Sequence, residues 1–304
     1  LMCLAACLVA GMLAAAHAQP AAWVLDDASY LQGSGGGVTV LRDPSRELTL
    51  DDVRTTSAQA RFMPLAGHLG EGYVPDAFWL RFEIRNPHDA PRERWLEIMP
   101  TFLDDIRVHH VAPDGTVDQR RGGDRLPQSA KEENYRGHVF KFQLQPGLNQ
   151  FFIRIETTST VAAIFRLWRP EAFDRHLRIS YFGFGVYFSL IFSVMLFNLV
   201  NWMLARRLEI IIYSVFLLAN ALLWSGGQGF GSEFLFPDNP PAANLAQQIA
   251  IPLAGALAIW FYIVALELRR HHPVAFRLSA LAIGVCGVGA VVTLLGHYQS
   301  VAGV

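Results

Sequence analysis

Residues 179–205 read ISYFGFGVYFSLIFSVMLFNLVNWMLA and contain no Asp, Glu, Lys or Arg. A helix needs about 20 apolar residues to cross the hydrocarbon core of a bilayer, so this stretch is long enough to span a membrane. A soluble protein of 304 residues has little reason to build a helix that is apolar on every side. The stretch therefore predicts that a soluble domain ends, and a membrane domain begins, near residue 179.

Further uncharged runs follow this stretch and predict a helical membrane domain over 179–304. Each run is long enough to cross a bilayer as a helix. The four expected spans lie at about 179–204, 210–231, 243–266 and 278–297.

Positive charges in the connecting loops predict the orientation of these spans. Arginines occur in the loop after the first span and in the loop before the fourth. The loop between the second and third spans contains neither Lys nor Arg. Because Lys and Arg favour the cytoplasmic side, the first and third loops are predicted to be cytoplasmic and the chain before residue 179 periplasmic. The arginines concerned are Arg206, Arg207, Arg269, Arg270 and Arg277.

Residues 1–18 form an apolar run of small residues that ends in a small-x-small pattern at Ala18. This pattern predicts a secretory signal peptide. An uncleaved anchor, or lipidation of Cys7, are the alternatives. All three cysteines lie in apolar runs, so the polar domain has neither a disulfide framework nor a thiolate metal site.

Residues 22–172 alternate between apolar and polar side chains as strands do. In FWLRFEIRNP (78–87), apolar residues at even positions share one face and Trp79, Arg81 and the other polar residues share the opposite face. Turn sequences rich in Asn, Pro and Gly separate the alternating runs. The fold class that this predicts is an all-β periplasmic sandwich or jelly roll, joined by a linker at 173–178 to an α-helical transmembrane bundle.

The bulk composition fits such a two-part chain. A hydrophobic content of 52% is high for a soluble protein and modest for a membrane protein. The net charge of −1 offers no argument for a nucleic-acid partner. Membrane lipids are the expected partners of the spans.

Two tryptophans of the polar strand faces are candidate ligand-binding residues. A sandwich places polar side chains on its outer faces, so Trp79 and Trp95 need a reason to lie there. One hypothesis is a platform that stacks on sugar rings, in which case replacing Trp79 leaves the core intact. The alternative is that these indoles cover the outer sheet or contact the membrane half or a partner. The remaining candidates for this site are Arg81, Asp104 and Asp105, although a turn-and-cap role is the alternative for the aspartates.

We find no pattern that indicates a catalytic site, a metal site or a cofactor. His109 and His110 are adjacent on a strand and point to opposite faces, so they are unsuited to chelating one metal, and a solvated strand is the expected setting. Asn198 and Asn201 share one face of the first span. Their amides suit interhelical hydrogen bonds, and the alternative is a role in signal relay.

Several stretches together resemble a known family, the bacterial seven-transmembrane receptors with diverse intracellular signalling modules. The polar half resembles that family's second type of extracellular domain, and the membrane half resembles its helical domain. The stretches are FWLRFEIRNP (78–87), WLEIMPTFLDDIRV (95–108), GGDRLP (122–127), GLNQFFIRIETTST (147–160), GFGVYFSLIFSVMLFNLVNW (183–202) and RRLEIIIYSVFLLANALLW (206–224).

The resemblance implies a sensor in the bacterial inner membrane. It would detect a periplasmic ligand, such as a carbohydrate or another small molecule, and would relay the signal to a cytoplasmic GGDEF cyclase or histidine kinase. A homodimer is a further expectation. Seven spans and an output module are expected of the family, so we expect this four-span chain, itself not an enzyme, to be a fragment.

Two alternative functions belong to other classes. The chain would then be a transporter or membrane enzyme with an accessory sandwich, or a structural anchor of the envelope. The absence of Asp, Glu, Lys and Arg within the spans weighs against a transport path.

Overall fold

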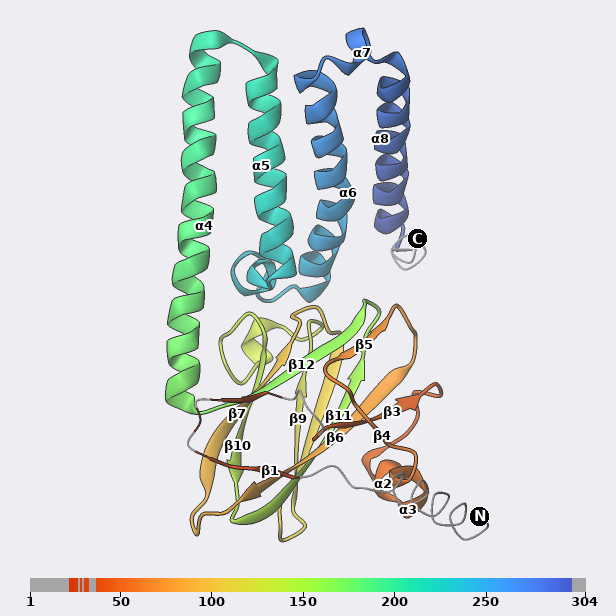
Figure 1. Ribbon diagram of the computed structural model, residues 1–304, viewed down its shortest axis with the longest axis vertical. Coiled ribbons are helices and arrows are strands. Elements are labelled where there is room, and N and C mark those ends of the chain that lie inside the picture. The colour runs from red at the N-terminus through yellow and green to blue at the C-terminus, as the bar shows by residue number, and fades with distance from the viewer. Residues whose placement is uncertain (1–21, 27, 29, 33–36, 297–304) are drawn as a thin grey trace, which may run out of the picture. The chain divides into compact units, whose positions relative to one another are not determined.

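The computed structural model describes residues 22–26, 28, 30–32 and 37–296, so the predicted signal peptide lies outside the described residues. The chain forms two compact units, and Figure 1 labels most of their helices and strands. The first unit contains all the strands, with β10 shared at its start. The second contains the long helices together with two short segments, Pro100–Phe102 and Gly123–Val139.

The first unit is built from two largely antiparallel sheets. The seven-stranded sheet has the order β4-β3-β6-β11-β8-β9, with β1 paired to β6. Its strands are β1 (Trp23–Val24), β3 (Thr39–Asp43), β4 (Met63–Pro64), β6 (Ala77–Asn86), β8 (Asp105–Val111), β9 (Val117–Gly122) and β11 (Gly147–Glu156).

The five-stranded sheet has the order β10-β7-β12-β2, with β5 paired to β12. Its strands are β2 (Tyr30–Gln32), β5 (Leu69–Gly72), β7 (Arg92–Met99), β10 (His138–Leu144) and β12 (Val161–Trp168).

The main core contains the apolar faces of both sheets. In β6 the even-numbered residues, such as Phe82 at 1% and Ile84 at 0% exposure, belong to one buried cluster. Leu96 and Ile98 of β7 and Phe165 of β12 join the same cluster from the other sheet. The predicted sandwich and the predicted inward faces of these strands are therefore confirmed.

A smaller cluster lies on the other face of the seven-stranded sheet. The short helices α2 (Leu50–Arg54) and α3 (Thr56–Gln59) follow β3. Val53 of α2 is fully buried, and it packs in this cluster with Trp79 and Phe152. The outer face of the sheet is thus partly covered by local structure.

Four helices of the second unit are long and apolar enough to cross a membrane. The first, α4, starts at Pro170, a residue suited to the first turn because that turn needs no backbone donor. The predicted linker at 173–178 lies within α4 and is helical. The elements of the unit are η1 (Gln128–Ala130), α4 (Pro170–Ala205), α5 (Leu208–Gly227), the π-helical turn η2 (Gly231–Leu235), α6 (Pro240–Ala265), α7 (Leu268–His271) and α8 (Pro273–Leu294).

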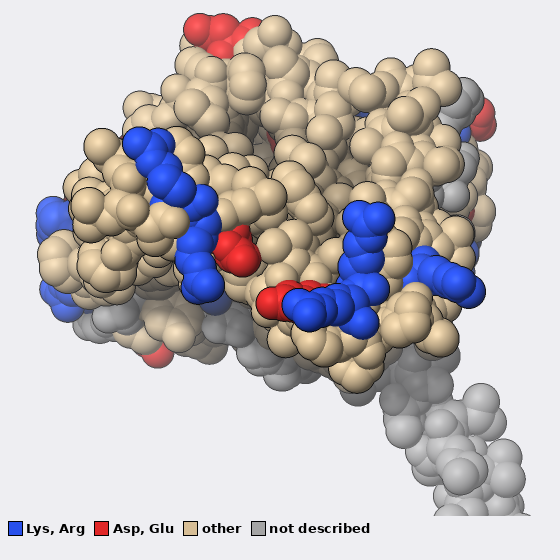
Figure 2. All heavy atoms as spheres, turned by 90° about the horizontal axis from the view of Figure 1, so that it is seen from above, with Lys and Arg blue, Asp and Glu red and all other residues tan. Residues whose placement is uncertain are grey.

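Basic residues mark one end of these helices. Arg206 and Arg207 connect α4 to α5, and Arg269 and Arg270 lie in α7, between α6 and α8. Figure 2 views the molecule from this end and shows Lys and Arg side chains standing out from a largely uncharged surface. The basic loops therefore lie at the same end of the helical unit, as alternating spans require.

Candidate functional site

Strand register places two rows of side chains on the outer face of the seven-stranded sheet. In an antiparallel ladder, directly paired residues point to the same face. Across β6, β11, β8 and β9, one row consists of Trp79, Arg154, Arg107 and Arg121. The adjacent row on the same face consists of Arg81, Phe152, His109 and Gln119.

A cavity of about 420 Å³ opens above these rows. Its size falls within the usual range for small-molecule sites. Trp79, Arg107, His109, Gln119 and Arg154 form the floor, and the segment 46–51 forms the roof.

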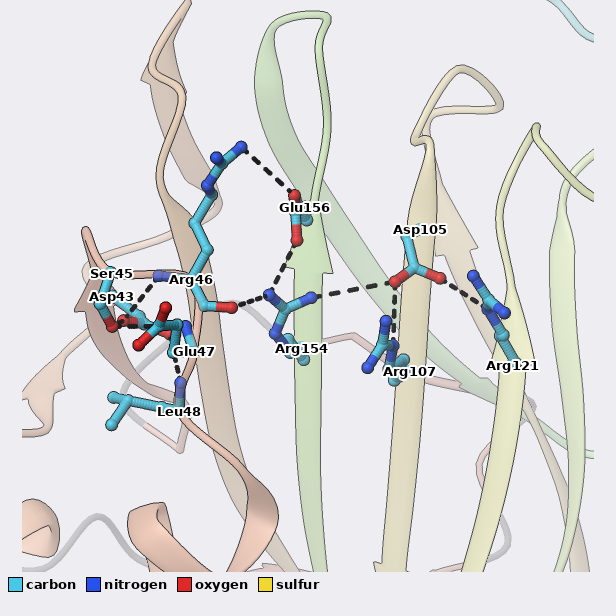
Figure 3. Close-up of polar contacts among 10 residues, drawn as sticks. All are labelled: Asp43, Ser45, Arg46, Glu47, Leu48, Asp105, Arg107, Arg121, Arg154 and Glu156. Atoms are coloured by element: carbon cyan, nitrogen blue, oxygen red, sulfur yellow. Dashed lines mark hydrogen bonds and ion pairs between the residues drawn. The ribbon is translucent and has the colours of Figure 1, made fainter. Parts of the chain in front are cut away.

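Ion pairs hold the floor of this cavity in place (Figure 3). Asp105 is 8% exposed and accepts hydrogen bonds from Arg107 Nε at 2.9 Å and from Arg121 Nε at 2.8 Å. Arg154 donates from Nη2 to Glu156 Oε2 at 2.8 Å, and its Nη1 lies 3.8 Å from Asp105 Oδ2. The carboxylates thus neutralise much of the arginine charge, and the cavity as a whole carries little net charge.

The roof is held by its own turn and by the floor. Asp43 accepts hydrogen bonds from Arg46 N and Leu48 N, each at 3.1 Å, which shapes the turn after β3. Arg46 has a φ of +59°, and its carbonyl accepts from Arg154 Nη2 at 2.8 Å. A buried arginine of β11 therefore anchors the roof of the cavity.

His109 supplies a neutral ring at neutral pH. Burial, helped by the positive charge of Arg107, lowers the pKa of His109 below its usual 6.5. Its ring stacks on Trp79 with centroids 5.7 Å apart. Trp79 Nε1 and His109 Nδ1 make no hydrogen bond to other described residues. Two buried nitrogens thus remain free beside the cavity.

Burial corrects two sequence-based expectations. Trp79 does lie on the face opposite the main core, but it is only 1% exposed because α2 and the preceding turn cover it. His109 and His110 are buried too, which contradicts a solvated strand. They point to opposite faces as expected, and His110 Nε2 pairs with Asn149 Oδ1 at 2.9 Å.

The other candidate residues do not form one site with Trp79. Trp95 lies on the five-stranded sheet, where its Nε1 donates to Glu93 at 2.8 Å and Lys141 Nζ lies 4.3 Å from its ring centroid. The two tryptophans therefore belong to different sheets and cannot make one stacking platform.

Arg81 and Asp104 are both mainly buried and paired. Arg81 Nη2 donates to Glu83 Oε1 at 2.6 Å. Asp104 accepts from Thr158 N at 3.1 Å and from Thr157 Oγ1 at 3.1 Å, and so it holds the turn after β11. Of the five predicted residues, only Trp79 lines the cavity, and Asp105 supports it through arginines.

The arginines and Gln119 of the cavity floor were not predicted from the sequence, and His109 was considered only as a metal ligand. Strand alternation places Arg154 and Arg107 on the outer face, but it does not say which strands are neighbours. The pairing of β11 with both β6 and β8 brings Arg154 between Trp79 and Arg107. That pairing joins residues far apart in the chain, so local pattern carries no signal for it.

The asparagines of α4 lie in the second unit. Asn201 Nδ2 donates to Phe197 O in its own helix at 3.0 Å. Asn198 Nδ2 is buried without a hydrogen-bond partner among the described residues. Within the described part of the chain, no three His, Cys, Asp or Glu side chains are grouped to hold a metal ion.

Two family models match the chain in succession. The model described as 7TMR-DISM extracellular 2 matches residues 35–169. The model described as 7TM diverse intracellular signalling matches residues 180–302. The first match covers the sandwich from β3 onward, and the second covers the helices from residue 180 of α4 onward. No curated protein matches the chain at a significant level.

Solved structures show only weak similarity. TmCBM61 in complex with beta-1,4-galactotriose is 10% identical with a TM-score of 0.22, covering 46% of this chain and 88% of that one. An exo-beta-1,3-galactanase from Phanerochaete chrysosporium is 13% identical with a TM-score of 0.21, covering 46% and 29%. A GH31 alpha-xylosidase from Xanthomonas citri is 10% identical with a TM-score of 0.21, covering 48% and 16%. Similarity at this level assigns neither a ligand nor a reaction.

Proposed function

The chain belongs to the family of seven-transmembrane receptors with diverse intracellular signalling modules, and we propose that it senses a small ligand at the outer-face cavity of its sandwich. It is a multi-pass membrane protein with an extracellular N-terminal domain. In this proposal the membrane is the bacterial inner membrane and the sandwich lies in the periplasm. A cytoplasmic cyclase or kinase, with dimerisation of the receptor, would complete the signalling path.

The observation that carries the proposal is the cavity of about 420 Å³ over the seven-stranded sheet. Its arginines are paired with carboxylates, so a strongly charged ligand has no large electrostatic advantage. Gln119 is exposed and offers an amide that suits hydroxyls, while the neutral His109 adds no charge. We therefore favour an uncharged, hydroxyl-rich ligand such as a sugar.

The ligand would act on the receptor through the roof. Residues 46–51 line the cavity, and Arg154 ties them to the sheet through the carbonyl of Arg46. A ligand that binds one position of this roof more tightly than another shifts the population between the two positions. Asn198 and Asn201 are proposed to belong to the helical part of the relay.

Binding by the full chain in detergent, screened on a glycan array and measured by calorimetry, tests the proposal. Gln119→Leu is expected to weaken binding at least tenfold, because Gln119 is exposed and lines the cavity. Gln143→Leu is the matched control, since it alters an exposed glutamine on β10, in the other sheet. Equal effects of the two variants, or a glycan bound equally well by Gln119→Leu, would place the ligand elsewhere.

A further inference from the structure

The segment Gly123–Val139, between β9 and β10, packs against helix ends within the second unit. Gln128 N donates to Pro237 O at 2.7 Å, and Ser129 Oγ lies 3.3 Å from Asp238 Oδ1. Both contacts reach the loop that connects η2 to α6. This connecting segment is therefore part of the helical unit, although its two ends continue into strands.

The Arg136 side chain of this segment contacts several groups of the helical unit. It is 5% exposed, and its guanidinium carbon lies 4.6 Å from the ring centroid of Phe184 and 4.9 Å from that of Phe230. Its Nη2 donates to Ser180 Oγ at 2.6 Å. Its Nη1 lies 3.5 Å from Gln228 Oε1. One cation thus holds α4, through Ser180 and Phe184, together with the loop between α5 and η2.

Neighbouring groups balance the buried charge of this cluster. Tyr181 Oη donates to both carboxylate oxygens of Glu233, at 2.7 and 2.8 Å. Burial raises the pKa of Glu233, while the positive charges of Arg136 and Lys131 oppose that rise. Burial also lowers the pKa of Lys131 to about 8, against the attraction of Glu233 and Asp124. A buried cation left without such partners is strongly unfavourable, so Arg136 resists separation from its contacts.

The backbone is shaped to accept this arginine. Gly229 has a φ of +82°, and a Cβ at that position would lie 2.6 Å from Arg136 O. Glycine alone permits both the backbone conformation and the close approach. The α5–η2 loop therefore contacts the segment 123–139 through its backbone at Gly229 as well as through the side chains of Gln228 and Phe230.

We propose that the segment 123–139 is the element that transmits movement of β9 and β10 to the outer ends of α4 and α5, with Arg136 as the clamp between them. The role of this movement in signalling rests on the proposed function. The contacts of Arg136 that form the clamp are present without a bound ligand, so the clamp does not depend on the proposed function. Arginine suits it because a planar guanidinium contacts two ring faces and two hydrogen-bond acceptors at once, whereas the ammonium of lysine does not.

Hydrogen exchange of the full chain in lipid nanodiscs tests the clamp. Arg136→Ala and Arg136→Lys are both expected to raise amide exchange more than tenfold in η2 and in the segment 123–139. Exchange in β6 and β11 should stay unchanged. Arg121→Ala is the matched control, because this arginine lies near the end of β9 in the first unit, its side chain is 59% exposed and it pairs with Asp105 at 2.8 Å. Unchanged exchange in η2 for Arg136→Ala overturns the proposal.

Transmission is tested by disturbing the strand residues that flank the segment 123–139, Gly122 of β9 and Phe140 of β10. A Cβ at Gly122 would lie 2.6 Å from Phe140 Cζ, so Gly122→Ala displaces the Phe140 ring and disturbs the contact between β9 and β10. Amide exchange in η2 should change at least threefold in Gly122→Ala relative to the native chain. In the double variant Gly122→Ala/Arg136→Ala, exchange in η2 should equal that of Arg136→Ala alone. Phe140→Leu disturbs the same contact by removing volume and serves if Gly122→Ala fails to fold.

A change confined to the strands and the segment, with η2 unaffected, contradicts transmission. These measurements need no ligand, so they stand or fall separately from ligand binding. If Gln119→Leu and its control bind equally while Arg136→Ala loosens η2, the clamp is retained and the proposed ligand site is rejected.

Discussion

Trp79 packs among Leu41, Val53 and Phe152 on one side of the sheet while its ring lies on that of His109. An aromatic side chain of this size buries a large apolar area, which makes it a main contributor to the smaller cluster. The same residue forms part of the cavity floor. The packing of the cluster and the shape of the cavity floor therefore both depend on this side chain.

Replacing Trp79 is expected to destabilise the first unit heavily. Trp79→Ala should lower the free energy of unfolding by about 3–5 kcal/mol, the usual cost of removing a large buried aromatic. Trp95→Ala should cost less, because Trp95 is 9% exposed and lies outside both apolar clusters. The free energies of unfolding of the two variants are compared by urea unfolding of the full chain in detergent, monitored by circular dichroism. A smaller loss for Trp79→Ala than for Trp95→Ala would contradict the assignment of Trp79 to a core.

His138 is expected to make stability depend on pH. Complete burial lowers the pKa of His138 to about 3, with a smaller effect of Lys131. The unfolded chain then binds a proton near pH 6.5, whereas the folded chain does not, so stability is full above pH 6.5 and declines as the pH falls toward 3. As the pH falls from 6.5 to 5, the protonation of His138 in the unfolded chain lowers the free energy of unfolding by about 2 kcal/mol.

The measurement is the urea midpoint at pH 7, 6 and 5 for the native chain and for His138→Asn. His138→Asn should show a flatter pH dependence, although it should be less stable at pH 7 because it loses the contact of Nε2 with Thr101 O at 3.2 Å. His109 and His110 have pKa values lowered by burial as well, so part of the slope should remain. An identical slope in both proteins would show that His138 titrates normally.

Helix α2 is too short to be stable alone, since isolated helices of this length do not form in water. Its N-cap Thr49 and Asp52 form a capping box, with Thr49 N donating to Asp52 Oδ2 at 2.8 Å. Val53, fully buried, fastens the helix to the sheet. Helix α2, which begins at the end of the roof, is thus held by its N-cap and by apolar packing, while Asp43 and Arg154 hold the preceding turn.

Removing the cap is expected to loosen the roof. Thr49→Ala should cost about 1 kcal/mol, while Thr49→Ser, which keeps the hydroxyl, should cost less. Amide exchange at residues 50–54 should rise in Thr49→Ala, with β6 and β11 unaffected. If Thr49→Ser loosens the helix as much as Thr49→Ala, the hydroxyl is not the stabilising group.

The chain passes between its two units several times. It leaves the first unit at Pro100 and at Gly123, returns at Leu103 and Phe140, and enters the helices at Pro170. Several covalent connections therefore join the strands to the helical unit, in addition to the connection into α4.

The orientation of the helices gives a prediction for the whole chain. Reporter fusions after Arg207 and after Arg270 are expected to be cytoplasmic, because these two loops between spans contain arginines whereas the loop before α6 contains neither Lys nor Arg. A fusion after Asp238 should be extracellular. Paired alkaline phosphatase and fluorescent-protein fusions give opposite readouts at each position. An extracellular readout from the fusion after Arg207 would contradict the predicted topology.

Local patterns account for the two fold classes of this chain. Alternation with a period of two places Phe82 and Ile84 in the core, and long uncharged runs predict the four spans, because both signals depend only on neighbours along the chain. The family resemblance, carried by stretches in both halves, is confirmed by the two model matches. The domain boundaries and the relay role of Asn198 and Asn201 stay predictions.

The sites depend on contacts between residues far apart in the chain. Trp79, Arg154 and Arg107 form one row only because β11 pairs with both β6 and β8, and alternation is equally compatible with other strand partners. Alternation correctly gives the face of Trp79, but its burial follows from a helix that begins at Leu50. In the sequence, Arg136 cannot be distinguished from other charged loop residues. Its role appears only in the folded chain, where α4 and the α5–η2 loop surround it. Side-chain direction is a local property, whereas burial and partnership require the whole chain to be folded.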